Sequence, residues 1–322
     1  MISGYSKEGM TKLAIGTHLG DFSDEDSKKY IDAISYALTH GITTIDGAIN
    51  YRGMCSEKDE GIAIRTLMEK GMLKREDFCI TSKAGLLFGD VREGLNPGRY
   101  LAEILEPRGI SLNDFNTYDG LYQTLKPAFF DIALEKTLSN LGLETLDIHY
   151  IHIPEITRAA LSEGEFYDRM EELFFWYENK VREGKIRYYG IALEFMVEEP
   201  EEGKWHFEIE QIQLRANKAA NGMSHFKYVL FTYNLLCPYA ATVPTQEVKG
   251  KKLTIIDACK ALGLSTVGSM PFAMGDGLKQ YTSKELLDFA LSGVDHVIVG
   301  SKNIAHIKEV QEIVNSNIRK FN

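Results

Sequence analysis

The sequence lacks several features that would place it in a specialised class of protein. None of its apolar runs approaches the length of about 18 residues that a membrane-spanning helix needs. No segment is rich in Lys or Arg, and the 322-residue chain carries a formal charge of −10. An acidic chain without a basic run is a poor match for nucleic acid or for an anionic membrane. We therefore expect an ordinary globular protein whose main partner is neither of these.

Cysteine is also scarce, and its spacing excludes two kinds of site. The four cysteines are Cys55, Cys79, Cys237 and Cys259, and no C-x-x-C pair occurs. The sequence therefore indicates neither a zinc ribbon nor a redox dithiol. Cys79 and Cys259 lie in apolar runs, where buried thiols are expected. The first residues, MISGYSKEGMTK, hold no apolar core of signal-peptide length, so we expect a cytoplasmic protein in a reducing environment.

Short apolar runs, rich in β-branched residues, recur along the whole chain. Most of them are continuously apolar rather than alternating, which is typical of strands that are buried on both faces. The eight predicted strands are Lys12–Thr17, Thr43–Ala48, Phe78–Lys83, Leu146–His152, Arg187–Leu193, Tyr228–Asn234, Ser265–Pro271 and Val294–Gly300.

Helical patterns fall between these runs, and several end at a glycine, as helix C-termini commonly do. The predicted helices are Ser23–Thr39, Ser56–Glu69, Phe129–Leu141, Glu165–Glu183, Leu253–Leu262, Ser283–Leu291 and Ile304–Ile318. Strand and helix in regular alternation predict a (β/α)8 barrel, and residues 1–322 contain no linker that would divide it. A doubly wound sheet is the alternative, but no G-x-G-x-x-G follows an early strand.

One connection is much longer than the others. Roughly forty residues, 84–123, separate the third predicted strand from its helix, and connections of this length are usually functional or disordered. On a barrel this segment lies at the C-terminal face, where active sites are found. Its aromatic residues Tyr100, Phe115, Tyr118 and Tyr122 could form one wall of a large pocket. The alternative is a surface insertion that packs on the barrel rim.

Four polar residues stand at or just after the ends of the second, third and fourth predicted strands: Asp46, Tyr51, Lys83 and His152. The C-terminal strand ends are where barrel enzymes build their sites. A tyrosine needs a lowered pKa to act as an acid or base near neutrality, and a nearby ammonium favours the phenolate. Asp46 could keep Lys83 charged, and His152 could orient a substrate oxygen. Each residue alone is more often structural, but the group predicts proton transfer to a carbonyl oxygen.

With these residues the chain resembles the aldo-keto reductases. The family pattern D-x-A-x-x-Y-x-x-x-x-S-E is matched by Asp46, Ala48, Tyr51, Ser56 and Glu57, and further matches are Lys83 in ITSKAG, Asp147, His152 and Pro154 in LDIHYIHIP, and Gly184 to Ile191. The resemblance implies a (β/α)8 barrel that uses NADP(H) without a metal. It implies that Tyr51 protonates the substrate oxygen, that Lys83 and Asp46 tune Tyr51, and that His152 orients the substrate. His149 lies three positions before His152 and should face the other way.

The resemblance also implies where the cofactor binds. The segment VIVGSKNIAHIKEV is similar to the family's site for the adenosine phosphate, at the start of a helix whose free N–H groups attract anions. Lys302 could pair with the 2′-phosphate and favour NADP(H) over NAD, although His306 stands where the family has an arginine. MPFAMGDGL is similar to the loop that covers the pyrophosphate. The implied cofactor-binding residues are Thr17, Asp46, Met270, Phe272, Gly275, Gly300, Ser301, Lys302, His306 and Glu309.

At the nicotinamide end the sequence departs from the family. Ala192 and Leu193 replace a Ser-Asn pair, Leu230 replaces a Gln, and Ser269 replaces an aromatic residue. Main-chain groups, His18 or Glu194 could hold the nicotinamide carboxamide instead. Three functions are therefore open. The first is an NADP(H)-dependent reductase of a small carbonyl compound, or dehydrogenase of an alcohol. The second is a regulatory subunit on the same barrel, and the third is a non-redox lyase or isomerase.

Overall fold

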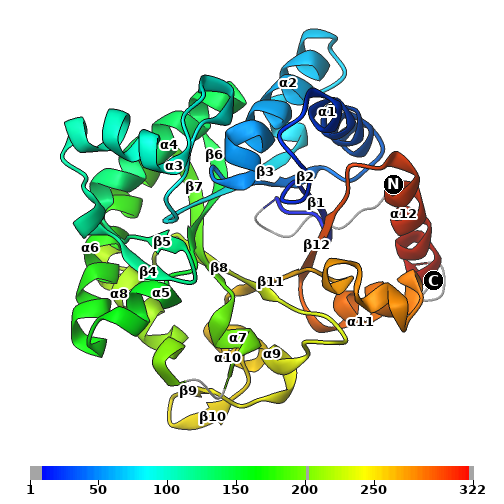
Figure 1. The fold of residues 1–322 in the computed structure, drawn as a ribbon. Coiled ribbons are helices and arrows are strands. Elements are labelled where there is room, and N and C mark those ends of the chain that lie inside the picture. Colours follow the sequence, from blue (N-terminus) through cyan, green and yellow to red (C-terminus); the bar gives the residue numbers. More distant parts are fainter. Residues whose placement is uncertain (1–8, 201–202, 319–322) are drawn as a thin grey trace.

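A computed structural model describes residues 9–200 and 203–318, and eight parallel strands close into a barrel in its centre (Figure 1). Around the barrel the strand order is β1-β12-β11-β8-β7-β6-β3-β2. The strands are β1 (Leu13–Gly16), β2 (Thr44–Asp46), β3 (Cys79–Ala84), β6 (Leu146–His152), β7 (Ile186–Leu193), β8 (Phe226–Thr232), β11 (Ser265–Ser269) and β12 (His296–Gly300). The predicted (β/α)8 barrel is confirmed, and each predicted strand corresponds to one of these.

Each barrel strand is followed by a helix that packs on the outside of the barrel (Figure 1). These helices are α1 (Asp24–Thr39), α2 (Cys55–Glu69), α4 (Pro127–Leu141), α6 (Glu163–Arg182), α8 (Ile209–Ala220), α10 (Ile255–Leu262), α11 (Ser283–Gly293) and α12 (Ile304–Ile318). The sequence patterns identified all of them except α8. Its buried face is formed by Ile209, Ile212, Ala216 and Ala219, and a stripe that ends in two alanines is weakly apolar.

The barrel has two separate apolar layers because side chains on a strand alternate between its faces. The interior is filled by Met10, Ala14, Cys79, Ile148, Tyr150, Ala192, Tyr228, Leu230, Val267 and Ile298. A larger layer lies between the strands and the surrounding helices. Cys79 belongs to the interior and Cys259 to the outer layer, and both thiols are buried, as predicted. The interior is therefore solid, and chemistry is confined to the strand ends.

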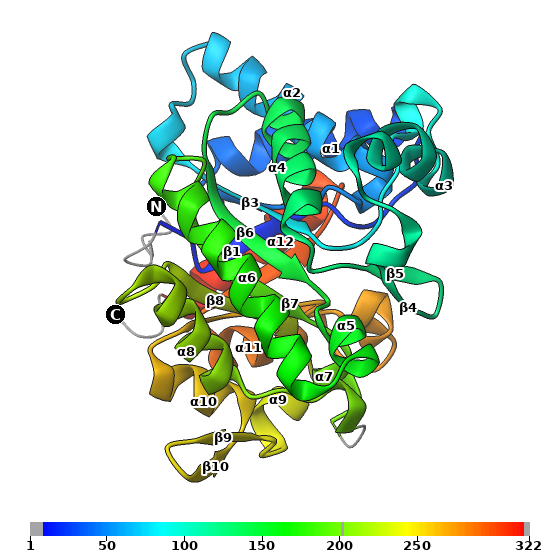
Figure 2. The same ribbon diagram turned by 90° about the vertical axis from the view of Figure 1, so that its left-hand side faces the viewer.

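The long segment after β3 is folded, and its apolar core is continuous with the layer between the strands and the helices. It contains α3 (Pro97–Tyr100) and the hairpin of β4 (Asn116–Tyr118) and β5 (Leu121–Gln123). Figure 2 shows α3, β4 and β5 at the same end of the barrel as α5 (Glu155–Ala160) and α7 (Phe195–Glu198). The segment thus covers part of the rim at the C-terminal strand ends.

The aromatic residues of this segment do not all face a pocket, which corrects one expectation. Tyr100 and Phe115 are buried in the segment's core, where Tyr100 packs on Phe88 and Phe115 on Phe129 of α4. Anchoring forty residues to a barrel requires apolar burial, and these two rings supply it. Tyr118 is partly buried and packs against Phe195 and Trp205, and Tyr122 is the most exposed of the four rings.

The remaining described elements are short. They are α9 (Tyr239–Thr242), the hairpin of β9 (Gln246–Val248) and β10 (Lys251–Leu253), and several 3-10 turns, of which η1 (Tyr51–Met54), η8 (Ala273–Gly275) and η9 (Gly277–Lys279) matter below. Within residues 9–200 and 203–318, no helix combines the length and apolar character needed to cross a membrane. That a single domain accounts for all of residues 1–322 stays a prediction.

Candidate active site

A buried ion pair joins the ends of β2 and β3. The Lys83 ammonium donates to Asp46 Oδ2 at 2.6 Å and to the Gly47 carbonyl at 2.8 Å. The second oxygen of Asp46 accepts from Thr81 Oγ1 at 2.7 Å. Burial works against the lysine's charge, but Asp46 and Tyr51 together overcome it and raise the pKa of Lys83 above its usual value. The expected pairing of Asp46 with Lys83 is therefore present, and the Lys83 ammonium is charged at neutral pH.

Tyr51 stands beside this pair on η1, the turn that follows β2. The Lys83 ammonium lies 4.8 Å from the centre of the Tyr51 ring. The turn is held by Arg52, whose buried guanidinium donates to the Asp21 carbonyl and to the Asp59 carboxylate. Arg52 also has a positive φ of 49°, a conformation that a non-glycine residue adopts only when its surroundings hold it there.

The pKa of Tyr51 differs from the expectation. Burial raises it above the ordinary value for a phenol, and the Lys83 ammonium opposes that rise only in part. The charge on Asp46 also raises it. The ammonium favours the phenolate, as expected, but the cost of burying a phenolate is larger. In this structure Tyr51 is a protonated phenol at neutral pH, able to donate a proton.

Two histidines flank the Tyr51 ring. The centre of the His152 ring lies 5.8 Å from that of Tyr51, and the exposed His18 lies 4.6 Å away. Burial, Lys83 and His18 lower the pKa of His152 well below its usual value, so the imidazole is neutral. Its Nδ1 is buried and has no hydrogen-bond partner within the part of the chain that the structure describes. Such an atom is costly unless something else pairs with it, and it makes His152 a candidate for contact with a ligand.

His149 is structural, as its place on β6 predicts. Its side chain points away from the barrel interior and packs against Phe130 of α4 and Trp176 of α6. Nδ1 forms a 2.9 Å hydrogen bond with the Tyr177 hydroxyl. Burial lowers the pKa of His149 to about 3, which keeps the ring neutral between the helices.

Other residues of the recognised motifs also hold the scaffold together. Glu57 of α2 accepts hydrogen bonds from Ser82 of β3 and from Thr137 and Asn140 of α4. Asp147, on β6, accepts from Arg75 and from the backbone N–H of Ile80. Both carboxylates bridge elements that are distant in sequence, and they fix the strands that carry Lys83 and His152.

Thr17 lies below the site and is fully buried. Its hydroxyl donates to Glu60 Oε1 at 2.8 Å, while Glu60 Oε2 has no hydrogen-bond partner among the described residues. Burial raises the pKa of Glu60 well above its usual value. Glycine is required at position 47, because a Cβ there would come within 2.5 Å of the Glu60 carboxyl. Thr17 therefore supports the floor of the site.

The wall opposite Tyr51 is built differently. Ala192 and Leu230 are neighbours across β7 and β8 and belong to the barrel interior, whereas Leu193 faces the outer layer. The next residue, Glu194, is partly exposed and is close enough to Tyr51 to raise its pKa. Burial raises the pKa of Glu194 to about 7. At the end of β7, Ala192 and Glu194 thus lie on the side of the strand that faces the barrel opening near Tyr51. Leu193 faces the surrounding helices.

A second carboxyl at this wall was missed by sequence reasoning. Glu155, at the start of α5, is fully buried and accepts from the backbone N–H of Glu194 at 2.7 Å. Its other oxygen has no partner among the described residues, and burial raises its pKa to about 8. The available signal was a glutamate among apolar residues, directly after the strand end, in IHIPEI.

Comparison with known proteins identifies the family of the chain. The sequence profile of the Aldo/keto reductase family matches residues 9–285. The chain belongs to the aldo-keto reductase family. That range contains Asp46, Tyr51, Lys83 and His152, while β12 and α12 lie beyond it.

Several curated proteins resemble the chain over part of its length. It is 30% identical over 153 residues to the horse "Aldo-keto reductase family 1 member C23-like protein", which is 48% of this chain and 33% of that protein. It is 28% identical over 174 residues to the "Uncharacterized oxidoreductase YtbE" of Bacillus subtilis, which is 54% of this chain and 44% of that protein. The chain thus spans less than half the length of these curated relatives.

Solved structures extend the likeness to the whole barrel. An aldo-keto reductase from Klebsiella pneumoniae in complex with NADPH has a TM-score of 0.61 at 17% identity, covering 95% of this chain and 86% of the other. The holo form of an aldo-keto reductase from Bacillus halodurans has a TM-score of 0.62 at 18% identity, covering 97% and 89%. At these identities the comparison establishes the fold.

Four of the residues that the aldo-keto reductase pattern implies for the cofactor lie around one cavity. Gly300, Ser301, Lys302 and His306 line a space of about 670 Å³ between the start of α12 and Tyr30 of α1. The Ser301 hydroxyl contacts the backbone of Asn303, whose side chain accepts from the Ala305 N–H and caps α12. The size of this cavity, the Lys302 ammonium and the exposed Gly300 are suited to the adenosine phosphate of a nicotinamide cofactor. Lys302, however, already forms an ion pair with Asp26.

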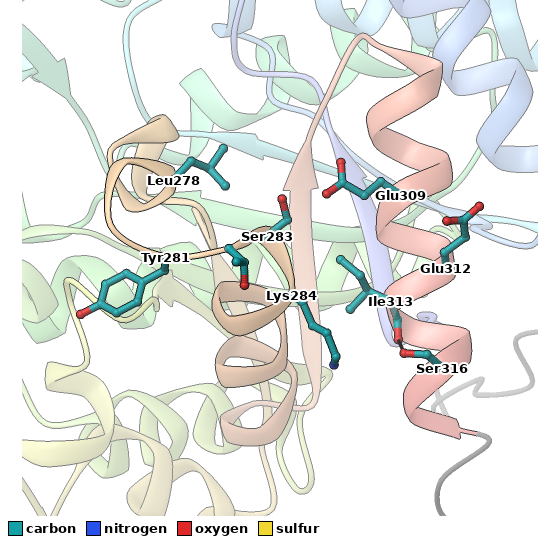
Figure 3. Close-up of a pocket in the computed structure, with 9 residues that line it drawn as sticks. Leu278, Tyr281, Ser283, Lys284, Glu309, Glu312, Ile313 and Ser316 are labelled. Carbon is teal, nitrogen blue, oxygen red and sulfur yellow. Dashed lines mark hydrogen bonds between the residues drawn. The ribbon is translucent and has the colours of Figure 1, made fainter.

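Three further residues lie on the loop after β11. The Met270 carbonyl accepts from Asn234, Phe272 packs on the outer layer, and Gly275 has a φ of 99° that favours glycine. Glu309 stands apart from the cavity beside Lys302, at a groove of about 680 Å³ between η9, α11 and α12. Figure 3 shows Glu309 pointing from α12 towards the segment that carries Leu278. The implied adenosine residues are thus divided between two neighbouring depressions.

Proposed function

We propose that this chain is a nicotinamide-dependent oxidoreductase that reduces a small aldehyde or ketone to an alcohol, or catalyses the reverse reaction. The observation that carries the proposal is Tyr51, a protonated phenol held beside the charged Lys83–Asp46 pair and the neutral His152. Family membership supports the same chemistry. Lys302 favours NADP(H) through its charge, whereas its ion pair with Asp26 opposes that preference.

In the proposed mechanism each of the four residues has a separate task. A bound reduced nicotinamide would supply the hydride. His152 donates a hydrogen bond that holds the substrate oxygen near Tyr51, and a neutral ring does so without repelling Lys83. Tyr51 gives its proton to the oxygen as negative charge develops there. The Lys83 ammonium stabilises the resulting phenolate, and Asp46 keeps that ammonium charged and in place. We propose no metal, because these hydrogen bonds can polarise the carbonyl themselves.

The test follows nicotinamide absorbance while the purified protein is mixed with NADH or NADPH and a panel of aldehydes and ketones. Tyr51→Phe removes only the proton donor, so we expect kcat to fall by about 10²–10⁴-fold while cofactor affinity is retained. Tyr122→Phe is the matched control, since its hydroxyl belongs to an exposed ring on the rim. Full activity in Tyr51→Phe would rule the proposal out.

The apolar Ala192 and Leu230 favour a second candidate, a regulatory or non-redox protein on the same barrel. The same experiment separates the two. Turnover of a substrate without any change in nicotinamide absorbance would indicate a lyase or isomerase. A protein that binds no nicotinamide cofactor, and whose measurable properties survive Tyr51→Phe, would indicate a regulatory role.

A further inference from the structure

The Lys302 ammonium, which the family resemblance assigns to a phosphate, is already engaged by a carboxylate of the same chain. Asp26, in the first turn of α1, accepts a hydrogen bond from Lys302 Nζ. Its side chain is 8% exposed and that of Lys302 is 34% exposed. The same carboxylate oxygen accepts from the backbone N–H of Asp21 at 2.9 Å. Asp26 is therefore fixed in place against Lys302, which lines the cavity.

Asp26 remains ionised under ordinary conditions. The hydrogen bond from Lys302 and that from the Asp21 N–H lower the pKa of Asp26 below its usual value. The loop also fits closely around the pair, because a Cβ at Gly20 would meet Asp26 Oδ2 at 2.6 Å and Lys302 Nζ at 3.3 Å. A permanent negative charge thus lies directly against the cation.

The other charged side chains at this cavity do not supply an unpaired positive charge for a phosphate. Lys29 lines it but pairs with Glu25 at 2.5 Å, and Asp32 lines it and pairs with Lys28. Asp21 lies close by and carries a further carboxylate. His306 occupies the position where the resemblance places an arginine. Each lysine that lines the cavity already has a carboxylate partner.

We propose that Asp26 determines cofactor choice, so that this cavity takes a ribose 2′-hydroxyl in preference to a 2′-phosphate and the chain uses NADH rather than NADPH. The proposal rests on the proposed function for its ligand. A phosphate monoester carries a charge of about −1.5 to −2 at neutral pH. Beside Lys302 it would lie next to Asp26, and like charges at such a distance repel. A 2′-hydroxyl is neutral and can donate to a carboxylate, as acidic residues do in other NAD sites.

The experiment measures dissociation constants for four nucleotides by calorimetry: NADH, NADPH, 5′-AMP and adenosine 2′,5′-bisphosphate. For the unmodified chain we expect NADH to bind about fivefold or more tightly than NADPH, and 5′-AMP more tightly than the bisphosphate. Asp26→Asn keeps an acceptor for the Asp21 N–H but frees the Lys302 ammonium. It should tighten NADPH and the bisphosphate by about tenfold, the scale of one charge-assisted hydrogen bond, and change NADH by less than about twofold.

Asp24→Asn is the matched control, because it removes the same charge from the same turn of α1. Asp24 pairs with Arg92 outside the cavity, so the NADPH-to-NADH ratio should stay within about twofold of the original. Circular dichroism and the thermal midpoint show whether Asp26→Asn is folded. If it is not, Lys302→Gln replaces it: the proposal expects that variant to leave NADPH affinity nearly unchanged.

Three results would overturn the proposal. The first is that the unmodified chain binds NADPH more tightly than NADH. The second is that the NADPH-to-NADH ratio of dissociation constants in Asp26→Asn equals that of the unmodified chain. The third is a tenfold loss of NADPH affinity in Lys302→Gln. Failure of the proposed function looks different. If the adenine nucleotides bind with the expected selectivity but no carbonyl compound is reduced, Asp26 still determines selectivity and the chemistry needs revision. If no nucleotide binds at all, both proposals fail.

Discussion

The two sides of the barrel mouth satisfy their polar groups in opposite ways. On the Tyr51 side, Lys83 and Asp46 are fully paired with each other and with Thr81 and Gly47. On the opposite side, Ala192 and Leu230 are apolar, and one oxygen of the buried Glu155 has no hydrogen-bond partner in residues 9–200 and 203–318. The first side pairs its charged groups with each other, whereas on the second side burial raises the pKa of the carboxyls of Glu155 and Glu194.

The difference shows which parts of the mouth are complete in the protein alone. A fully hydrogen-bonded ion pair is rigid and holds Tyr51 in one position. A buried carboxyl without a hydrogen-bond partner destabilises the folded protein. Such a group commonly has a shifted pKa or forms its hydrogen bond only when a ligand binds. We therefore expect the Tyr51 side to tolerate little change and the Glu155 side to respond to pH, to the cofactor and to substitution.

The largest effect should come from Lys83→Met. The variant removes the cation that stabilises the Tyr51 phenolate, and we expect kcat to fall by about 10²–10⁴-fold. It also leaves Asp46 buried without a counter-ion, at a cost of about 3–5 kcal/mol in the free energy of unfolding. Steady-state kinetics and urea denaturation measure the two effects.

The double variant Lys83→Met with Asp46→Asn separates them. Removing both charges should restore most of the stability and none of the activity. Removing one partner of a buried ion pair lowers the free energy of unfolding strongly, whereas replacing both partners by uncharged residues does not. Recovery of activity in the double variant would mean that Lys83 acts only as a counter-ion for Asp46, and the contrast between the two sides would then lose its functional meaning.

Glu155→Gln should have the next largest effect, with a clear pH dependence. The pKa of Glu155 rises from 4.5 to about 8 in the folded protein. Between these values the folded protein holds a proton that the unfolded chain has lost, so the free energy of unfolding falls as pH rises through this window. The glutamine variant escapes that loss. At about pH 9 it should be more stable than the unmodified chain by about 2–4 kcal/mol, with little difference at about pH 4.

Chemical denaturation at the two pH values checks this expectation. Glu172→Gln, on the exposed face of α6, serves as the control and should show no such dependence. An equal effect of Glu155→Gln at both pH values would mean that Glu155 is ionised in the folded protein, and the two sides of the mouth would then be alike.

Leu230→Gln should have a moderate effect on cofactor binding. The side chain belongs to the barrel interior beside Ala192, and a glutamine there could hydrogen-bond the nicotinamide carboxamide. One additional net hydrogen bond of about 1 kcal/mol corresponds to about fivefold tighter binding of NADH, measured by fluorescence titration. Leu193→Gln is the control, because Leu193 faces the helices. It should lower stability without tightening binding, and equal gains in both variants would contradict the assignment.

The smallest effect should come from Glu194→Gln. Glu194 has a pKa of about 7 and, once ionised, raises the pKa of Tyr51. Removing its charge should move the alkaline limb of the pH–rate profile to lower pH, while rates below about pH 7 change less than about threefold. An unchanged profile would mean that solvent screens Glu194 from Tyr51.

Much of this arrangement could be predicted from local patterns. Continuous apolar runs separated by helical periods and glycines are sufficient to predict the barrel, because both signals are short-range. Asp46, Tyr51, Lys83 and His152 could be identified because parallel strands bring their C-terminal ends to one edge. Helix α8 was missed because its buried face ends in two alanines, and Glu155 because a single glutamate after a strand usually lies in solvent.

The sequence by itself determined the fold, the family and the four residues beside the proposed hydride site, since each depends on residue type and spacing along the chain. Only the tertiary structure decided the charge states and the partners. It raised the pKa of Tyr51 through burial, buried Tyr100 and Phe115 in the rim, and paired Lys302 with Asp26, which lies 276 positions away in the chain. Desolvation and ion pairing depend on distances in space, and no local pattern carries that information.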